Sequence, residues 1–205
     1  VLVEEVVDDL RAQGVEAISV LADLETWAGA SDVMAKTAEH FGRIDILINN
    51  VGGAINFKPF TEFSESEIAA EVQRSLMPTL WCCRAVLPTM IEQRDGKIVN
   101  LSGAGVSGPS ETLSAYGTSK AAVIRFSETL AAEVRQYNIS VNCLAPGQID
   151  TDMLDAATVV SEDMVDSRFL AQVRRTKSGH GASLEEAAAL AVWLASYEAD
   201  GLTGR

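Results

Sequence analysis

The sequence places a tyrosine and a lysine four positions apart, Tyr116 and Lys120, within the stretch "SAYGTSKAA". On a helix, a spacing of four brings two side chains onto the same face. A free phenol titrates near pH ~10, too high for ready proton exchange at neutral pH, and a nearby ammonium favours the phenolate. The pair can therefore act as an acid–base catalyst and its tuner, although the same spacing also arises by chance on helix surfaces.

The elements around this pair favour the chemical interpretation, because helical and strand patterns alternate along the chain. Such alternation predicts βαβ units and a doubly wound parallel α/β sheet in three layers. The run at 44–50 is continuously apolar, as expected for a strand covered on both faces. Ligands of such sheets bind beyond the carboxyl ends of the strands, which here are rich in glycine and small polar residues. We expect helices at 2–13, 29–42, 65–93, 115–137 and 184–196, and strands at 16–24, 44–50, 96–102 and 139–147.

Length and composition predict a single domain over residues 1–205, with 47% hydrophobic and 22% charged residues. The net charge of −13 argues against a nucleic-acid partner, which would require a basic surface. The longest apolar runs are shorter than the ~20 residues of a membrane span. The acidic start "VLVEEVVDDL" lacks the basic segment of a signal peptide, so a cytoplasmic location is expected.

The sequence predicts no metal site. Three cysteines, Cys82, Cys83 and Cys143, form no C-x-x-C pair and are interpreted as buried small residues in a reducing compartment. The two histidines, His40 and His180, are isolated from each other and from any cluster of metal-ligating residues.

Four short motifs, in this order and spacing, resemble the short-chain dehydrogenase/reductase family. They are "ADL" at 22–24, "NNVG" at 49–52, "YGTSK" at 116–120 and "NCLAPGQIDT" at 142–151. The stretch "INNVGGAINFKPF…SLMPTLWCCRAVLP" is similar in particular to the branch that oxidises cis-dihydrodiols of aromatic acids. The resemblance implies a Rossmann-type fold and hydride transfer between NAD or NADP and a small-molecule secondary alcohol, ketone or cis-diol.

The resemblance also assigns catalytic roles. Tyr116 would be the acid/base, and Lys120 would lower its pKa and hold the cofactor ribose. The family serine that orients the substrate oxygen usually stands thirteen residues before the tyrosine, where this chain has Gly103. Ser102 is the natural candidate if the following loop is one residue longer than usual. Two weaker alternatives are Ser107, in mid-loop, and Ser114, which is better interpreted as a helix N-cap.

A fourth family position, normally an asparagine in the long central helix, aligns with Ser75. One alternative is a helix-surface serine without a role. Pro78 argues against it, because a proline has no N–H and leaves the carbonyl of Arg74 without its helical partner. The free carbonyl and the local kink would then support the path by which protons reach solvent from Lys120.

The cofactor contacts implied by the resemblance lie at the carboxyl ends of the strands. Asp23 and Leu24 would contact the adenine, and Asn49 and Gly52 the adenine ribose, although Asn49 also fits a simple strand-end turn. Residues 152–180 would form a mobile lid that sets substrate specificity. The implied cofactor-binding residues are Asp23, Leu24, Asn49, Gly52, Tyr116, Lys120, Pro146, Gly147, Ile149 and Thr151, of which the last two would meet the nicotinamide carboxamide.

On the same resemblance, the chain is expected to lack the family's first βαβ segment, with its Gly-rich phosphate loop and the residue that selects NAD or NADP, and to stop where the final strand begins. Departures at Gly103 and Ser75 leave a non-catalytic dinucleotide-binding or scaffolding protein, or an inactive fragment, as the alternative. A homodimer or homotetramer is expected through the helices at 65–93 and 115–137, with Trp81, Phe126 and Leu130 as interface or core residues.

Overall fold

A computed structural model gives the structure of the chain and describes residues 3–103, 106, 108–158, 165 and 167–205. Its centre is a parallel sheet of three strands in the order β1 (Ile46–Asn49), β2 (Gly96–Leu101) and β3 (Ile139–Leu144). In the register, Ile48 lies opposite Val99, and Val99 lies opposite Asn142. The predicted parallel α/β architecture is confirmed.

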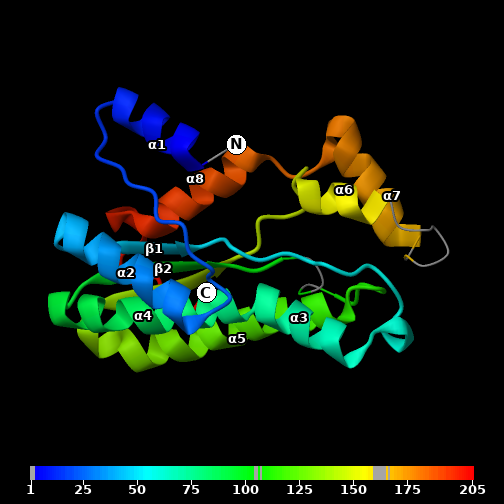
Figure 1. The fold of residues 1–205 in the computed structure, drawn as a ribbon, viewed down its shortest axis with the longest axis horizontal. Helices are drawn as coiled ribbons and strands as arrows, with labels where there is room; N and C mark the ends of the chain where they lie inside the picture. The colour runs from blue at the N-terminus through cyan, green and yellow to red at the C-terminus, as the bar shows by residue number, and fades with distance from the viewer. Residues whose placement is uncertain (1–2, 104–105, 107, 159–164, 166) are drawn as a thin grey trace.

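Helices cover both faces of this sheet, so the molecule has three layers (Figure 1). In Figure 1, α1 (Val3–Ala12) and α8 (Leu184–Ala195) lie above the sheet, and α6 (Asp152–Thr158) and α7 (Ser167–Arg175) lie at one end of it. Below the sheet are α2 (Trp27–Phe41), α3 (Glu65–Ser75), α4 (Met77–Gln93) and α5 (Ser114–Val134). Short 3-10 turns span Phe60–Glu62, Arg135–Tyr137 and Tyr197–Ala199, and one π turn spans Thr176–His180.

The larger hydrophobic core lies between the sheet and helices α2, α4 and α5. Val86 and Met90 of α4 are completely buried there and belong to the same cluster as Ile98 of β2. Burying one such side chain contributes about 1.5–3 kcal/mol. A smaller core beneath α8 consists of Val99, Leu101, Leu144 and Leu194.

Trp81, Phe126 and Leu130, which were expected at an interface or in the core, differ in how deeply they are buried. Leu130 is a buried member of the larger core, whereas Trp81 and Phe126 are partly buried against it. The Trp81 ring meets Trp27 edge-on, with 5.9 Å between ring centroids. Leu130 is therefore a core residue of this chain.

The strand predicted at 16–24 is wrong, because this segment has no regular secondary structure. A parallel strand needs a neighbour with which to exchange backbone hydrogen bonds, and the sheet of the described residues ends at β1. The backbone carbonyl of Ala17 is instead bound by the Arg11 guanidinium, with Nη2 to O at 2.8 Å. Leu21 is left 79% exposed.

The expectation that both faces of strand 44–50 are covered is also wrong. In β1, Leu47 and Asn49 are buried, but Ile46 and Ile48 on the opposite face are 47% and 46% exposed. The physical reason is the placement of α8, because this helix packs on side chains of β2 and β3. No side chain of β1 belongs to that buried cluster. The run is apolar on both faces, and only one face of it is covered.

The helix predicted over 65–93 is divided into α3 and α4 at Leu76, whose backbone angles are φ −119° and ψ −49°. Pro78 consequently lies in the first turn of α4, where a missing N–H costs no hydrogen bond. The predicted disturbance of the helix is confirmed, and it lies just before the proline.

Residues near the end of the chain run beside β3. The N–H of Gly204 donates to the carbonyl of Val141 at 2.8 Å, and the N–H of Cys143 donates to the carbonyl of Arg205 at 2.5 Å. Two backbone hydrogen bonds thus join residues 204–205 to β3, although no strand is assigned at these residues.

Candidate active site

Tyr116 and Lys120 are brought together where β2 ends and α5 begins. Both lie in the first two turns of α5, and their side chains are only 5% and 4% exposed. The Lys120 Nζ donates to the carbonyl of Leu101, the last residue of β2, at 3.0 Å. The helix therefore presents the phenol and the ammonium at the carboxyl edge of the sheet, as the spacing predicts.

Gly103 lies directly against the phenol of Tyr116. A Cβ added to Gly103 would be 2.2 Å from the Tyr116 Oη and 3.5 Å from the Cγ of Lys120. No side chain fits at this position without moving the tyrosine. The glycine at the family's serine position is therefore what allows the hydroxyl to lie so close to the backbone.

The pKa of Tyr116 is shifted in the direction opposite to the sequence prediction. Burial raises the pKa to about 12, and the negative charge of Glu71 raises it further in the same sense. Burial also lowers the pKa of Lys120, because a charged ammonium is poorly solvated there. The causes of the shift in the pKa of Tyr116 are burial and Glu71, and Lys120 is not among them. Tyr116 therefore holds its proton.

Ser102 is buried, but its hydroxyl faces the backbone of α5. The Oγ donates to the carbonyl of Lys120 at 3.1 Å, and the backbone N–H donates to the carbonyl of Leu144 at 2.8 Å. These contacts tie β2 to α5 and β3. They give no support to the prediction that Ser102 orients a substrate oxygen beside Tyr116.

The alternative serines do not fill this role. Ser107 lies outside the described residues. Ser114 is the first residue of α5 and is exposed. Its prediction as an N-cap is wrong, because the cap position is Leu113, without a side-chain hydrogen bond.

Ser75, the last residue of α3, is 1% exposed and donates its hydroxyl to the carbonyl of Gly53 at 3.1 Å. The alternative of a helix-surface serine is therefore wrong. Nearby, Gly52 has φ +139°, and a Cβ added there would be 3.2 Å from the Arg74 carbonyl and 3.4 Å from the Lys120 Nζ. The Arg74 carbonyl, which the sequence predicted to lack a helical partner, and the Lys120 ammonium therefore both lie next to Gly52.

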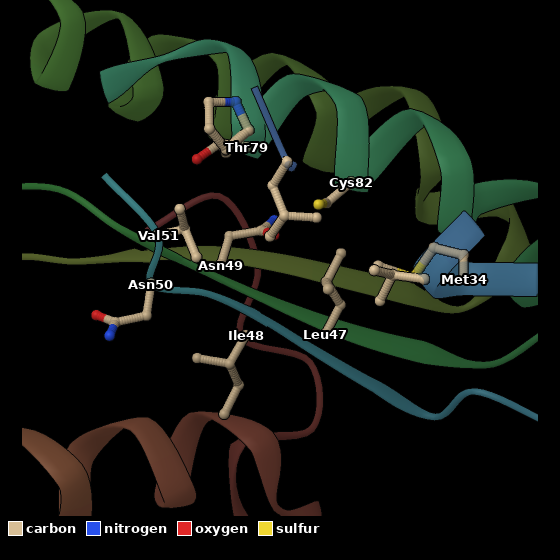
Figure 2. Close-up of a pocket in the computed structure, with 11 residues that line it drawn as sticks. Met34, Leu47, Ile48, Asn49, Asn50, Val51, Thr79 and Cys82 are labelled. Atoms are coloured by element: carbon tan, nitrogen blue, oxygen red, sulfur yellow. The ribbon is translucent and has the colours of Figure 1, made fainter. Parts of the chain in front are cut away.

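A cavity of about 150 Å³ lies beside the end of β1, between α2 and α4 (Figure 2). Leu24 and Val33 line it together with Asn49, as the resemblance implies for Leu24 and Asn49. The Asn49 amide is turned into the protein, where Nδ2 donates to Asn100 Oδ1 at 2.8 Å. Figure 2 shows Asn50 pointing the other way. The Asn49 side chain therefore ties β1 to β2. A ligand in the cavity could contact this side chain, but its Nδ2 already donates to Asn100.

Asp23 stands next to Leu24 but is not among the residues that line this cavity. Its Oδ1 accepts from the N–H of Glu25 at 3.0 Å, and its backbone carbonyl accepts from the hydroxyl of Thr26 at 2.8 Å. Thr26 in turn caps α2. Asp23 thereby shapes the entry to α2.

The four remaining residues predicted to contact the cofactor lie together between β3 and α6. Gly147 has φ +77°, and the carbonyl of Gln148 accepts from the N–H of Ala182 at 2.9 Å. The Thr151 carbonyl accepts from the Leu154 N–H at 2.9 Å at the start of α6. This loop holds Pro146, Gly147, Ile149 and Thr151 beyond the carboxyl end of β3.

The segment predicted as a lid packs over the tyrosine. Leu154 of α6 and Phe169 of α7 share one buried cluster with Tyr116 and Phe57. The rings of Phe57 and Phe169 are stacked, with 5.8 Å between centroids. Residues 159–164 and 166 of the predicted lid lie outside the described residues.

Sequence reasoning missed Glu71, Phe57 and Met153. Glu71 is completely buried in α3, and the Met153 Sδ accepts from the N–H of Ala54 at 3.3 Å. The spacing between Glu71 and Ser75 placed both on one helical face. That spacing was the one signal that could have identified the glutamate.

Cys82 and Cys83, predicted to be buried small residues, are both buried. Burial raises the pKa of Cys82 to about 11 and that of Cys83 to about 12, which holds both as thiols. In the described part of the chain, His, Cys, Asp and Glu side chains form no group of three that could hold a metal ion. Within the same residues, no helix is long and apolar enough to cross a membrane.

The comparisons with known proteins show what the chain as a whole is similar to. A family model described as "short chain dehydrogenase" matches residues 2–160. The 1,6-dihydroxycyclohexa-2,4-diene-1-carboxylate dehydrogenase of Acinetobacter baylyi is 49% identical over 146 residues, which cover 71% of this chain and 55% of that protein. The chain therefore spans about half the length of this relative.

Two further relatives align over nearly the whole chain. The 2,3-dihydroxy-2,3-dihydro-p-cumate dehydrogenase of Pseudomonas putida is 30% identical over 197 residues, covering 96% of this chain and 74% of that protein. The solved structure of NAD⁺-bound xylitol dehydrogenase superposes with a TM-score of 0.85 at 29% identity, covering 98% of this chain and 81% of that chain.

Proposed function

The chain belongs to the short-chain dehydrogenase family, and from this premise we propose that it serves hydride transfer between NAD or NADP and a secondary alcohol or ketone. The observation that carries the proposal is the buried pair Tyr116 and Lys120 at the carboxyl edge of a parallel sheet. Two relatives named as dehydrogenases of ring dihydrodiols support a cis-diol of a cyclic acid as the substrate class.

The residues present fit part of a dinucleotide. The cavity beside β1 has apolar walls from Leu24 and Val33 and suits a flat ring such as adenine. At Gly52 a positive φ and the absence of a Cβ let the Arg74 carbonyl and Lys120 Nζ lie close to the backbone. In this proposal Asp23, Asn49, Pro146, Gly147, Ile149 and Thr151 complete the contacts along the same edge of the sheet.

The cofactor, when bound, supplies or takes up the hydride. Tyr116 exchanges the proton at its Oη with the substrate oxygen, and Gly103 leaves room for the phenol against the backbone. Because the pKa of Tyr116 is raised to about 12, the phenol is protonated at neutral pH and suited to donate to a ketone. Alcohol oxidation requires the phenolate, so its rate should rise with pH.

Lys120 and Ser75 support the proton transfer in this proposal. Lys120 is held at Leu101 by its 3.0 Å hydrogen bond and faces the same glycine as the carbonyl of Arg74. The ammonium thus lies beside Gly52, where the Arg74 carbonyl is also found. Ser102 positions α5 on β2 through its bond to the Lys120 carbonyl.

The proposal extends to the whole chain as one domain, with residues 152–180 acting as a lid whose movement admits substrate. Its contacts with Tyr116 run through side chains of α6 and α7. We expect a cytoplasmic homodimer or homotetramer, with α4 and α5 in the contact and with Trp81 and Phe126 at its rim.

The test is an assay of reduced nicotinamide formation with cis-dihydrodiols of aromatic acids, a polyol such as xylitol, and simple secondary alcohols, each with NAD and with NADP. We expect the highest kcat/KM with a cis-dihydrodiol and a loss of turnover of about 10²–10⁴-fold in Tyr116→Phe. If the chain binds dinucleotide in an equilibrium titration but turns over no substrate, the non-catalytic binding protein becomes the better reading.

A further inference from the structure

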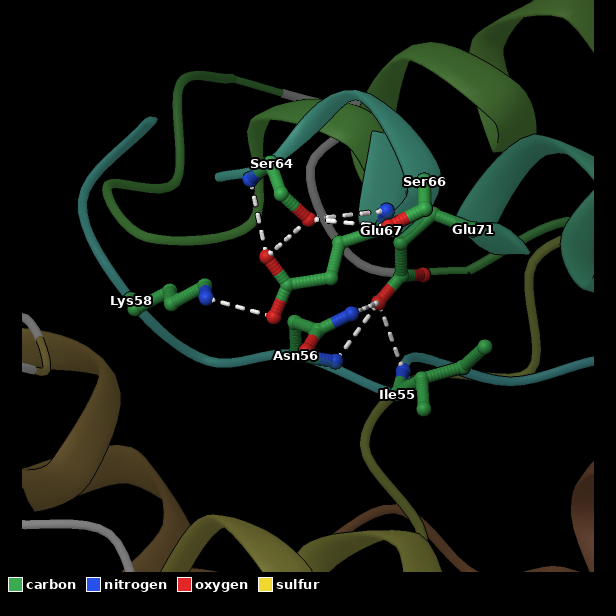
Figure 3. A network of polar contacts seen from close by, with 7 residues as sticks. All are labelled: Ile55, Asn56, Lys58, Ser64, Ser66, Glu67 and Glu71. Atoms are coloured by element: carbon green, nitrogen blue, oxygen red, sulfur yellow. Dashed lines mark hydrogen bonds and ion pairs between the residues drawn. The ribbon is translucent and has the colours of Figure 1, made fainter. Parts of the chain in front are cut away.

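Glu71 is a completely buried glutamate in α3 that holds a loop by three hydrogen bonds to a single oxygen (Figure 3). Its Oε1 accepts from the N–H of Ile55 at 2.8 Å and from the N–H of Asn56 at 2.6 Å. The side-chain amide of Asn56 adds a third bond to the same oxygen at 3.3 Å. The carboxylate thus clamps the backbone of this segment to α3.

The second oxygen of Glu71 has no such partner. Oε2 is buried and makes no hydrogen bond within the described part of the chain. An unpaired buried polar atom costs about 1–3 kcal/mol, and more when it is charged. The clamp itself needs only an acceptor at Oε1, which a neutral amide side chain would also supply. The clamp alone therefore does not account for a carboxylate at this position.

The clamped segment is the wall that faces Tyr116. The N–H of Ala54 donates to the Met153 Sδ of α6 at 3.3 Å, and the carbonyl of Gly53 accepts from Ser75. Phe57, at the other end of the segment, belongs to the buried cluster that contains Tyr116. Displacement of this segment would therefore move the side chains that enclose the phenol.

Glu71 also acts on the phenol through its charge. After burial, it is the group that raises the pKa of Tyr116. Lys120 is the buried charged residue on Tyr116's own helix, where Arg125 and Glu128 form an ion pair and Glu133 is exposed. Lys58 in the clamped loop is paired with Glu67 at 2.6 Å. On the helices packed over the phenol, the charged residues Asp152, Asp155, Arg168, Arg174 and Arg175 are all exposed.

We propose that Glu71 is a positioning residue for proton transfer at Tyr116, whose carboxylate locks the wall Gly53–Phe57 and places a buried negative charge beside the phenol. This charge adds to the effect of burial in disfavouring the phenolate of Tyr116. The expected change in the pH profile of turnover rests on the proposed function. The expected change in the titration of Tyr116 does not.

Glu71→Gln tests the charge, because the amide retains an acceptor and nearly the same shape. The matched control is Glu67→Gln, one turn earlier on α3, where the carboxylate instead bonds Ser64 and Lys58. The chain has three tyrosines, so ¹³Cζ-tyrosine NMR resolves them, and Tyr116→Phe assigns the signal. The phenolate fraction of Tyr116 is measured at the highest pH at which circular dichroism shows all variants folded.

We expect the titration midpoint of Tyr116 to fall by about one pH unit in Glu71→Gln and to stay unchanged in Glu67→Gln. In an active protein, the pH profile of alcohol oxidation should move to lower pH by the same amount. Equal phenolate fractions in wild type and Glu71→Gln would overturn the proposal. A shifted midpoint without turnover on any substrate would reject the proposed function and leave this inference standing.

Amide hydrogen exchange tests the clamp at neutral pH. Ile55 and Asn56 should lose protection at least about tenfold in Glu71→Ala and much less in Glu71→Gln, since only the alanine removes the acceptor. Unchanged protection of both amides in a folded Glu71→Ala would refute the clamp. If Glu71→Ala does not fold, Glu71→Leu, which fills the same space without an acceptor, gives the same comparison.

Discussion

The carboxyl edge of the sheet has two sides that differ in kind. Around Tyr116 the site is dry and contains ionisable groups whose pKa values are shifted, with Lys120 and Glu71 near the phenol. Around Leu24 and Asn49 there is a cavity with mostly apolar walls, and its asparagine is already engaged by the neighbouring strand. In the proposed function, this difference assigns proton chemistry to one side and ring binding to the other. Substitutions on the two sides should therefore change different kinetic constants.

The largest effect is expected from Tyr116→Phe. The ring keeps its packing with Phe57 and Leu154, but the exchangeable proton is lost. Turnover should fall by about 10²–10⁴-fold, while the dissociation constant of the dinucleotide stays within a factor of about two. Stopped-flow kinetics and a fluorescence binding titration measure the two quantities. A variant that loses binding and turnover together would show that the two sides are not separable.

The free energy of unfolding at alkaline pH should depend on the buried phenol of Tyr116, and it can be measured without any substrate. The pKa of Tyr116 rises from 10.0 to about 12 on folding, so its contribution is fully present below pH 10 and is lost as pH rises to 12. The raised pKa corresponds to about 2–3 kcal/mol. Urea denaturation at a series of pH values should show this loss in wild type and not in Tyr116→Phe. Tyr197→Phe, at a residue 80% exposed, should retain the wild-type slope.

The next largest effect is expected from Gly103→Ser, which should displace the side chain of Tyr116. The new Cβ would stand 2.2 Å from the Tyr116 Oη, so the phenol must move and turnover should fall at least about tenfold. Gly108→Ser is the control, because a Cβ at Gly108 in the same loop meets nothing within 4 Å. Higher turnover in Gly103→Ser would mean that a serine restores substrate orientation and that the close packing of Tyr116 is dispensable.

The sequence predicted what depends on local spacing. Tyr116 and Lys120 share a helical face because helix periodicity requires it, and α2 ends at Gly42 as the glycine indicates. The break near Pro78 likewise follows from the missing N–H. These features need no knowledge of which segments become neighbours in space.

The features that the sequence did not predict depend on neighbours distant along the chain. Segment 16–24 has the composition of a strand but no ladder partner. The pKa of Tyr116 depends on burial by α6 and α7 and on Glu71, none of which adjoins it in sequence. The contact between Gly103 and the phenol arises only when β2 and α5 pack together.

The smallest predicted effect belongs to the cavity side. Val33→Phe places a larger side chain into the cavity of about 150 Å³ between α2 and the end of β1. The KM for the dinucleotide should rise about tenfold, equivalent to about 1.4 kcal/mol, with kcat unchanged. Val192→Phe, at a position 67% exposed on α8, is the control for the added ring. A fall in kcat with constant KM would place this cavity on the path of the proton instead, and the division of the sheet edge into a chemical side and a binding side would have to be abandoned.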